Sequence, residues 1–341
     1  MALLYGADIV FEFPMPFCSA SAQKFARSGV SLLNSLGVDF ISFGSESGNL
    51  NELLAAKDAL LKIEKNEILQ TGLKQGKNFA KARQEAAEIA TGTELKILKS
   101  PNNILATEYL HALDFFNSKI QPVTIKRAGT GHDARETKDD FASASYIRQN
   151  LDSEISFESF VPPYATGIML EEIAAGRAPA MLKNLEKAIL AVLYKIDTQQ
   201  LAAVPEISEG LEHRIKKSLS GAKGIEELFE CIKSKRYTMS RVRRCVLWAF
   251  LGVSEELLPE RVPYAAVLGF NKRGRAFLKS KSKATEIPII IKPGNADKQL
   301  DSAALKIFEF NSFCSDIYSL ACPEIQPGGR HLKTSPVYIE D

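Results

Sequence analysis

Residues 8–43 read DIVFEFPMPFCSASAQKFARSGVSLLNSLGVDFISF, and this stretch decides the class of fold. Asp8 to Phe13 is apolar and stops at Pro14, which is typical of a buried strand. Residues 22–36 place apolar side chains at helical spacing between serines and Gly37. Val38 to Phe43 reads as a second strand. Strand, helix and strand within about forty residues predict a βαβ unit and a parallel sheet.

The rest of the chain extends this prediction. Residues 49–117 read as helices, the last of which begins at Pro101, and residues 120–129 (IQPVTIKRAG) read as a third strand. We therefore expect a doubly wound α/β domain over 1–155, with a parallel sheet. Residues 156–255 read as helices without strands. Residues 256–341 alternate strand and helix again and predict a small C-terminal α/β module.

Composition limits the function classes. The 341 residues are 45% hydrophobic and 25% charged, with a formal net charge of +2, so no global field indicates nucleic acid. The five cysteines form no C-x-x-C pair, which favours reduced thiols and disfavours structural zinc. We find no signal peptide and no apolar run of membrane-spanning length, and we expect a cytoplasmic protein without a membrane partner.

Two segments could contact a nucleoside. The loop GSESG (44–48) follows a predicted strand, and ligands of open parallel sheets bind beyond the carboxyl ends of strands. Gly44 would let a ligand approach the backbone, although an ordinary strand-to-helix turn is the more frequent explanation. In SPNNIL (100–105), Asn102 could read a base or ribose edge, but helix capping explains it at least as well.

Two further segments could bind phosphate. Arg127 ends the third predicted strand and could hold a phosphate through its guanidinium, or it could simply be solvated there. In SASYIR (143–148), Ser143 and Ser145 stand at a predicted helix start, where free N–H groups attract anions. An ordinary serine cap is about equally consistent with this pattern.

Residues 213–244 are locally basic, with ten Lys or Arg against three Glu. Such a run is usually a solvated helix face, yet its clustering with Tyr237 is also typical of a surface that holds a phosphate backbone. The polar loop residues His132, Asp133 and Asp139 read as solvated rather than catalytic. The sequence has no Ser-His-Asp spacing, no zinc spacing and no G-x-x-x-x-G-K loop.

Nine segments in order resemble the tRNA(Met) cytidine acetate ligase family. They are GADIVFEFP (6–14), FARSGVSLLNSLG (25–37), FGSESG (43–48), PNNIL (101–105), KRAG (126–129), SASYIR (143–148), SEGLEHRI (208–215), KSKRYTMSR (233–241) and VPYAAVLGFNKRG (262–274). The resemblance implies a nucleotidyltransferase-like fold of the HIGH superfamily. It also implies activation of acetate by ATP to acetyl-adenylate, followed by acetyl transfer to N4 of the wobble cytidine of elongator tRNA(Met).

The resemblance also implies site residues. ATP would contact Gly44, Asn102 and the Arg127–Ala128 pair, with Ser143 and Ser145 near the phosphates and Mg²⁺ accompanying the nucleotide. No DNA partner is implied. The implied tRNA surface comprises Arg214, Lys216, Lys217, Lys235, Arg236, Arg241, Arg243 and Arg244.

One part of the family pattern is absent. Members begin with a strand and a loop of the form N-P-F-H-N-G-H, which this sequence lacks, so we expect an N-terminally truncated chain and name no catalytic residue. The alternative to an active ligase is a non-catalytic nucleotide- or tRNA-binding remnant of that enzyme. Loop histidines of this kind stabilise charge on the leaving pyrophosphate, and their loss typically costs on the order of a hundredfold in rate.

Overall fold

The computed structural model describes residues 1–63, 67–127, 142–151, 158–281 and 285–340. The chain forms two compact units, each built from separate stretches of sequence. The first unit comprises Met1–Glu12, Ile125–Asn184 and Pro263–Asp341, and the second comprises Phe13–Thr124 and Leu185–Val262. The predicted domain ranges 1–155, 156–255 and 256–341 stay a prediction.

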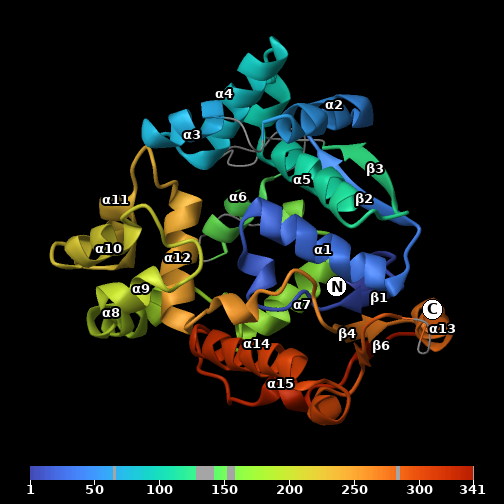
Figure 1. The fold of residues 1–341 in the computed structure, drawn as a ribbon. Helices are drawn as coiled ribbons and strands as arrows, with labels where there is room; N and C mark the ends of the chain where they lie inside the picture. Colours follow the sequence, from blue (N-terminus) through green and yellow to red (C-terminus); the bar gives the residue numbers. More distant parts are fainter. Residues whose placement is uncertain (64–66, 128–141, 152–157, 282–284, 341) are drawn as a thin grey trace. The chain divides into compact units, whose positions relative to one another are not determined.

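The second unit contains a helical layer and a two-stranded sheet (Figure 1). Its helix α1 (Ala22–Leu36) confirms the prediction, because Gly37 ends it in the left-handed conformation at φ 64°. Helices α1 and α5 (Pro101–Phe115) pack together, and apolar residues including Val30, Leu53 and Leu110 form their shared core. The remaining elements of this half are β2 (Phe40–Ser45), β3 (Gln121–Lys126), α2 (Leu50–Leu61), α3 (Glu67–Lys74), α4 (Phe79–Thr91), and the 3₁₀ helices η2 (Phe17–Ser19) and η3 (Lys96–Lys99).

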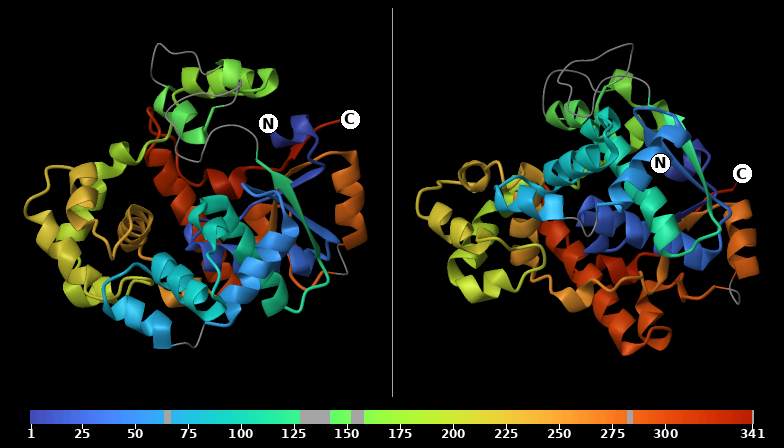
Figure 2. Two further views of the ribbon diagram at one scale, coloured as in Figure 1. Left: turned by 90° about the horizontal axis from the view of Figure 1, so that it is seen from above. Right: turned by 45° about the horizontal axis from the view of Figure 1, so that its top comes forward.

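The other half of the second unit is a group of short helices, visible together in Figure 2. Each of the larger helices buries apolar side chains, and Trp248 of α12 is fully buried and donates its indole N–H to Ser19 Oγ at 2.8 Å. No strand occurs among residues 185–262, all of which the structure describes, as the sequence predicts. The elements are α8 (Glu186–Lys195), α9 (Thr198–Ala202), α10 (Leu211–Leu219), α11 (Ile225–Ile232), α12 (Met239–Leu251) and η6 (Glu255–Leu257).

The first unit is built on a four-stranded sheet in which β4 (Ala265–Phe270) pairs with each of the other three strands. β1 (Ile9–Phe11) pairs antiparallel with β4, whereas β5 (Ile289–Ile290) and β6 (Val337–Tyr338) pair parallel with it. Its helices are α6 (Ala144–Gln149), α7 (Pro163–Ala174), α13 (Lys272–Lys281), α14 (Ser302–Leu320) and α15 (Arg330–Lys333), with η1 (Ala2–Tyr5), η4 (Glu158–Phe160) and η7 (Pro293–Lys298). The 3₁₀ helix η5 (Leu182–Leu185) ends where the second unit resumes.

This arrangement confirms a mixed α/β fold but corrects one prediction. The strand at 8–13 does not join the strand at 38–43 in one parallel sheet, because β1 pairs with β4 instead. Asp8 fixes that pairing. Its carbonyl accepts from Asn271 N at 3.0 Å, and its carboxylate accepts from Asn271 Nδ2 at 2.8 Å.

Glycine is required where α13 meets β1. A Cβ atom at Gly274 would lie 2.0 Å from the carbonyl oxygen of Asp8, so the two backbones can approach only without a side chain there. This explains a glycine inside a helix, where it would otherwise be unfavourable. None of the helices that the structure describes is long and apolar enough to cross a membrane.

Candidate functional site

The loop after β2 and the first turn of α5 form one hydrogen-bonded assembly. Asn102 donates to Glu46 Oε1 through its backbone N–H (3.2 Å) and its side-chain Nδ2 (2.8 Å). Asn103 N donates to Glu46 Oε2 at 2.8 Å, and Asn103 Oδ1 accepts from Ser47 N at 3.1 Å. The structure therefore holds the loop that follows Gly44 at the start of α5, which carries Asn102, whereas a shared ligand site of Gly44 and Asn102 stays a prediction.

Glu46 was missed by the sequence analysis, although it lies inside the quoted GSESG loop. Burial opposes its charged form, but the hydrogen bonds from Asn102 and Asn103 outweigh burial and lower the pKa of its carboxyl group. The negative charge also faces the N-terminus of α5, where it is favoured. Because Asn102 Nδ2 is engaged by Glu46, the side-chain oxygen of Asn102 is the atom left to accept from a ligand.

The loop is tied to β3 as well. Ser45 Oγ lies 2.7 Å from Thr124 Oγ1 and also accepts from Gly48 N at 3.0 Å. Arg127 follows β3 and is exposed, and it belongs to the first unit. In the same unit, Ser143 is buried and caps α6 by accepting from Tyr146 N at 3.0 Å, so the capping explanation is confirmed for its hydroxyl.

Other predicted residues have separate outcomes. Ser145 Oγ accepts from Arg148 Nη2 at 3.4 Å. Ala128, His132, Asp133 and Asp139 lie outside the described residues.

The basic run of residues 213–244 divides into two groups. In the first group, the cations hold the second unit together. Arg214 Nη2 donates to the carbonyls of Cys231 (2.9 Å) and Lys233 (3.1 Å) at the end of α11, and Lys216 Nζ donates to the carbonyl of Leu193 at 2.8 Å. Such bonds satisfy helix carbonyls that would otherwise lack donors.

Arg241 and Arg244 also belong to the first group. Arg241 Nη1 donates to Glu209 Oε2 at 2.8 Å, and Arg244 Nε donates to Glu206 Oε2 at 2.6 Å. These four cations, predicted as an RNA surface, are thus engaged by protein groups.

The second group is available to a ligand. Lys217, Lys235 and Arg243 are exposed and Arg236 is half-buried. Arg243 makes a surface pair with Glu226 at 3.1 Å, a kind of contact that contributes little stability, and its guanidinium carbon lies 5.6 Å from the centroid of the Phe229 ring. Within the part of the chain that the structure describes, the side chains of Lys217, Lys235 and Arg236 have no hydrogen bond or ion pair with another residue.

The second unit also contains a cavity of about 590 Å³, which the sequence did not predict. Its walls come from the start of α1, from α4 and α5, from residues 206–209 and from residues 236–244. Most of its surface is apolar, with Leu60, Leu98 and Ile104 among the lining residues. Its charged wall residues include Glu108 and Glu206, which are 98 positions apart, so no sequence spacing could have paired them.

The described residues contain no group of three or more His, Cys, Asp or Glu side chains placed to hold a metal ion. The protein part of the site consequently offers hydrogen-bond donors, acceptors and cations.

Comparisons with known proteins place these features in a family. The family model of the HIGH nucleotidyl transferases matches residues 1–331. A tRNA(Met) cytidine acetate ligase of Thermoanaerobacter sp. (strain X514) is 37% identical over 94% of this chain and 81% of the relative. One of Caldicellulosiruptor saccharolyticus is 35% identical over 99% of this chain and 85% of the relative.

Solved structures agree with this match. The apo crystal structure of TmcAL from Thermotoga maritima covers 100% of this chain and 86% of its own, at 28% identity and a TM-score of 0.93. A second crystal structure of that protein, bound with alpha-thio ATP, covers the same shares at 27% identity and a TM-score of 0.91.

Proposed function

The chain belongs to the tRNA(Met) cytidine acetate ligase family, and from this premise we propose that it joins acetate to a cytidine of tRNA(Met) at the expense of ATP. Acetate attacks the α-phosphorus of ATP, which forms acetyl-adenylate and releases pyrophosphate. The N4 amine of the wobble cytidine of elongator tRNA(Met) then takes the acetyl group and releases AMP. Similarity along nearly the whole chain to relatives named as ligases favours this enzyme over a non-catalytic remnant.

The observation that supports the ATP site is the assembly of Glu46, Asn102 and Asn103 beyond the end of β2. Ligands of open α/β sheets bind at such strand ends. Gly44 admits the nucleotide, and the free side-chain oxygen of Asn102 accepts from a ribose hydroxyl or the adenine amine. Arg127, with Ala128, holds a phosphate, and Ser143 and Ser145 lie near the phosphates. Positioning and charge neutralisation then supply most of the catalysis.

Mg²⁺ enters as part of the substrate, bound to the phosphates of ATP. Held by the phosphates, it would neutralise charge on the leaving pyrophosphate. The RNA surface consists of Lys217, Lys235, Arg236 and Arg243, the cations that are not engaged in holding helices together. The reaction takes place in the cytoplasm.

Arg127→Ala tests the ATP site. Loss of a charge-assisted contact should raise the Kd for ATP by roughly five- to a hundredfold. Lys126→Ala is the matched control, because Lys126 is a neighbouring exposed cation with no assigned role. Isothermal titration of both variants with Mg-ATP measures the effect, and an unchanged Kd in Arg127→Ala contradicts the proposed role.

The activity itself is measured by incubating the purified chain with ATP, labelled acetate and a tRNA(Met) transcript. The expected product is N4-acetylcytidine, identified in the nuclease digest by mass spectrometry. RNA binding without any acetylcytidine would favour the non-catalytic remnant instead.

A further inference from the structure

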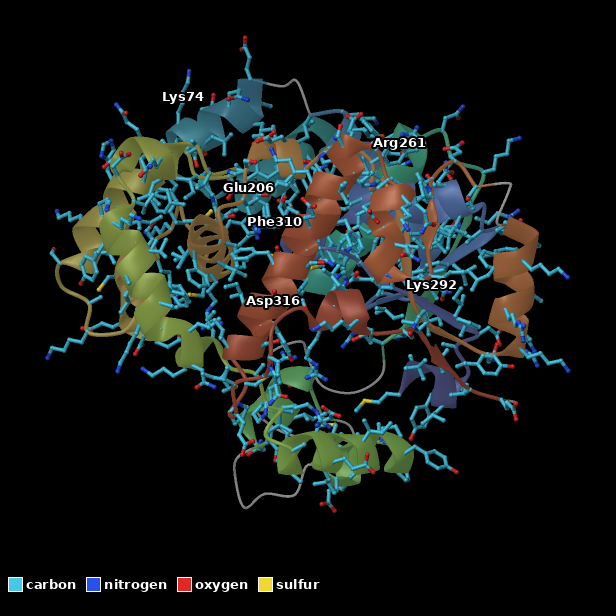
Figure 3. All side chains as sticks on the ribbon, turned by 90° about the horizontal axis from the view of Figure 1, so that it is seen from below. Lys74, Glu206, Arg261, Lys292, Phe310 and Asp316 are labelled. Atoms are coloured by element: carbon cyan, nitrogen blue, oxygen red, sulfur yellow. The ribbon has the colours of Figure 1, made fainter. Side chains whose placement is uncertain are left out.

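The cavity of the second unit holds two carboxyl groups that each have an unused oxygen. Glu108 is 4% exposed, and its Oε1 pairs with Arg83, whereas its Oε2 has no partner among the described residues. Glu206 accepts from Arg244 at Oε2, whereas its Oε1 is buried and likewise without a partner in the described chain (Figure 3 labels Glu206). A buried acceptor without a donor is destabilising, so a bound donor would be stabilised here.

The backbone of the same wall is unusual. Glu206 and Glu209 both adopt positive φ (65° and 62°), which is uncommon for residues with a side chain. Arg241 and Arg244 fix this segment from α12 through the hydrogen bonds described above. The unused oxygen of Glu206 is therefore carried by a segment that is held in a strained but well-anchored conformation.

The remaining lining defines the shape of the ligand. Apolar side chains make up most of the wall, so the ligand needs apolar faces and a donor-bearing edge, which a nucleobase with an exocyclic amine provides. Phe79 lines the cavity and is 50% exposed, with the guanidinium carbon of Arg83 lying 5.9 Å from the centroid of its ring. The exposed part of the ring can stack on a base, the contact that single-stranded bases make with aromatic side chains. The volume of about 590 Å³ lies within the usual range for small-ligand pockets.

A cation at the cavity favours RNA over a free nucleoside as the ligand, because only RNA carries a phosphate. Arg236 lines the cavity and has no partner among the described residues, and it continues into the exposed group that includes Lys235. An unpaired guanidinium beside a base pocket is suited to the phosphate that precedes or follows the bound base.

Helix α5 connects this cavity with the ATP site. Asn102 stands in its first turn, Ile104 already lines the cavity, and Glu108 follows two turns on. At 1.5 Å rise per residue, the six positions from Asn102 to Glu108 span about 9 Å along the helix axis. An acyl donor held at the helix start would thus lie close to a base held in the cavity.

We propose that this cavity receives the acceptor cytosine of the RNA, with Phe79 stacking on the ring and Glu206 Oε1 accepting from the N4 amine. This inference rests on the proposed function and adds to it the protein groups that select cytosine. Glu108 Oε2 adds a second acceptor on the same wall. A uracil would present its O4 acceptor to the carboxylate, which disfavours it.

The test uses two anticodon stem-loops that differ only by cytosine or uracil at the wobble position. For the wild-type chain, we expect the Kd of the uracil loop to be roughly 5- to 150-fold higher, the discrimination of one well-placed base contact. Glu206→Gln should bring this ratio close to one, because an amide can also donate to O4. The ratio is informative because a merely structural defect would weaken both loops alike.

Phe79→Ala should weaken both loops by about fivefold or more through loss of stacking. Phe313→Ala, which removes a similarly exposed aromatic ring from α14 in the first unit, is the matched control and should change neither Kd. Titration of the same variants with Mg-ATP separates the two possible sources of an amine-bearing base. An unchanged Kd for ATP supports the cytosine pocket.

Four results would overturn the inference. Equal binding of both loops by the wild-type chain would show that the cavity does not select cytosine. Unchanged loop affinity in Phe79→Ala would show that the base does not bind there. In either case, acetylation of tRNA by the same chain would leave the proposed function intact. Weakened ATP binding with unchanged loop binding assigns the cavity to the adenine. If the wild-type chain binds neither loop, the RNA part of the proposed function fails together with the inference.

Discussion

Each unit contains a set of polar side chains around shielded carboxyl groups, and the two sets differ in how completely the carboxylate oxygens are paired. The closed cluster is Glu12, His331 and Ser312 in the first unit, and the open cluster is Glu108 and Glu206, with their arginines, in the second. In the first unit, Glu12 Oε2 lies 3.2 Å from His331 Nε2, and the other ring nitrogen of His331 lies 2.6 Å from Ser312 Oγ. In the second unit, Glu108 and Glu206 each leave one oxygen without a donor in the described chain. Both sets of carboxyl groups line cavities, since Glu12 and His331 lie on one of about 270 Å³. A carboxylate oxygen with a donor contributes to stability, whereas one without a donor can accept from a bound group.

Arg83 is the most sensitive test of the open cluster. Arg83→Met should lower the free energy of unfolding of the second unit by about 3–5 kcal/mol, because it leaves Glu108 charged and buried without its cation. Urea unfolding can be followed by the fluorescence of Trp248, the only tryptophan, which is buried in the same unit. The double variant Arg83→Met/Glu108→Leu should recover most of the loss. A loss as large in the double variant would mean that packing, not charge, dominates.

Replacement of exposed cations tests whether the second unit, which contains the open cluster, binds RNA. Joint replacement of Lys235, Arg236 and Arg243 by Ala should reduce the slope of log K against log salt by about two, since three phosphate contacts are lost. At 0.1 M salt this corresponds to up to roughly a hundredfold weaker tRNA binding. Replacement of Lys272, Arg273 and Arg275 on α13 removes the same charge from the first unit and is the control. If both triple variants give the same slope, the patch is merely solvated.

The closed cluster predicts a pH effect. Burial opposes ionisation of Glu12, but the hydrogen bonds from His331 and Asn311 outweigh it and lower the pKa of this carboxyl group. A lowered pKa in the folded state gives stability that is present above the ordinary value near 4.5 and is lost as the pH falls through the folded value. Glu12→Gln should cost about 1–3 kcal/mol at pH 7 and flatten the acid limb.

Urea titrations followed by circular dichroism between pH 7 and pH 3 measure this effect. Glu309→Gln, on the exposed surface of α14, is the control and should leave the acid limb unchanged. An acid limb of the same steepness in Glu12→Gln would show that the cluster does not link folding to protons.

The smallest expected effect concerns the thiol of Cys245, which lies next to Glu206 of the open cluster. Cys245 lies with its Sγ 3.6 Å from the carbonyl oxygen of Glu206, and burial raises the pKa of its thiol to about 11. At pH 8 in the folded protein, we expect Cys245 to resist thiol reagents while the exposed Cys231 reacts. Mass spectrometry of the labelled peptides tests this. Equal labelling of both would indicate that the cavity wall opens to solvent.

Local features of the fold could be predicted because they depend on neighbouring residues. Helix α1 ends at Gly37 and α5 begins at Pro101 as predicted, since a left-handed glycine and a proline in the first turn are local signals. The partner of β1 could not be predicted. The sequence of a short apolar strand does not indicate which strand it pairs with. Here the pairing depends on Asn271, which is far away in the sequence.

The candidate site shows the same limit. The sequence indicated Gly44 and Asn102, because a glycine loop after a strand and an amide at a helix start are visible patterns. It could not show that Glu46 joins them, nor that Arg214 and Lys216 serve helix ends. Charge counts treat every cation alike, whereas only contacts distinguish a cation that holds the fold from one that meets a ligand.

The pairing of β1 with β4 also governs the order in which the protein can fold on the ribosome. Ile9 pairs with Phe270, so 261 further residues must be translated before this strand meets its partner. At about 5–20 residues per second, that wait is roughly 13–50 s. During synthesis the unpaired strand exposes apolar side chains and free backbone groups, the state that chaperones recognise. Nascent chains halted shortly before residue 265 should therefore bind holdases more strongly than the released protein.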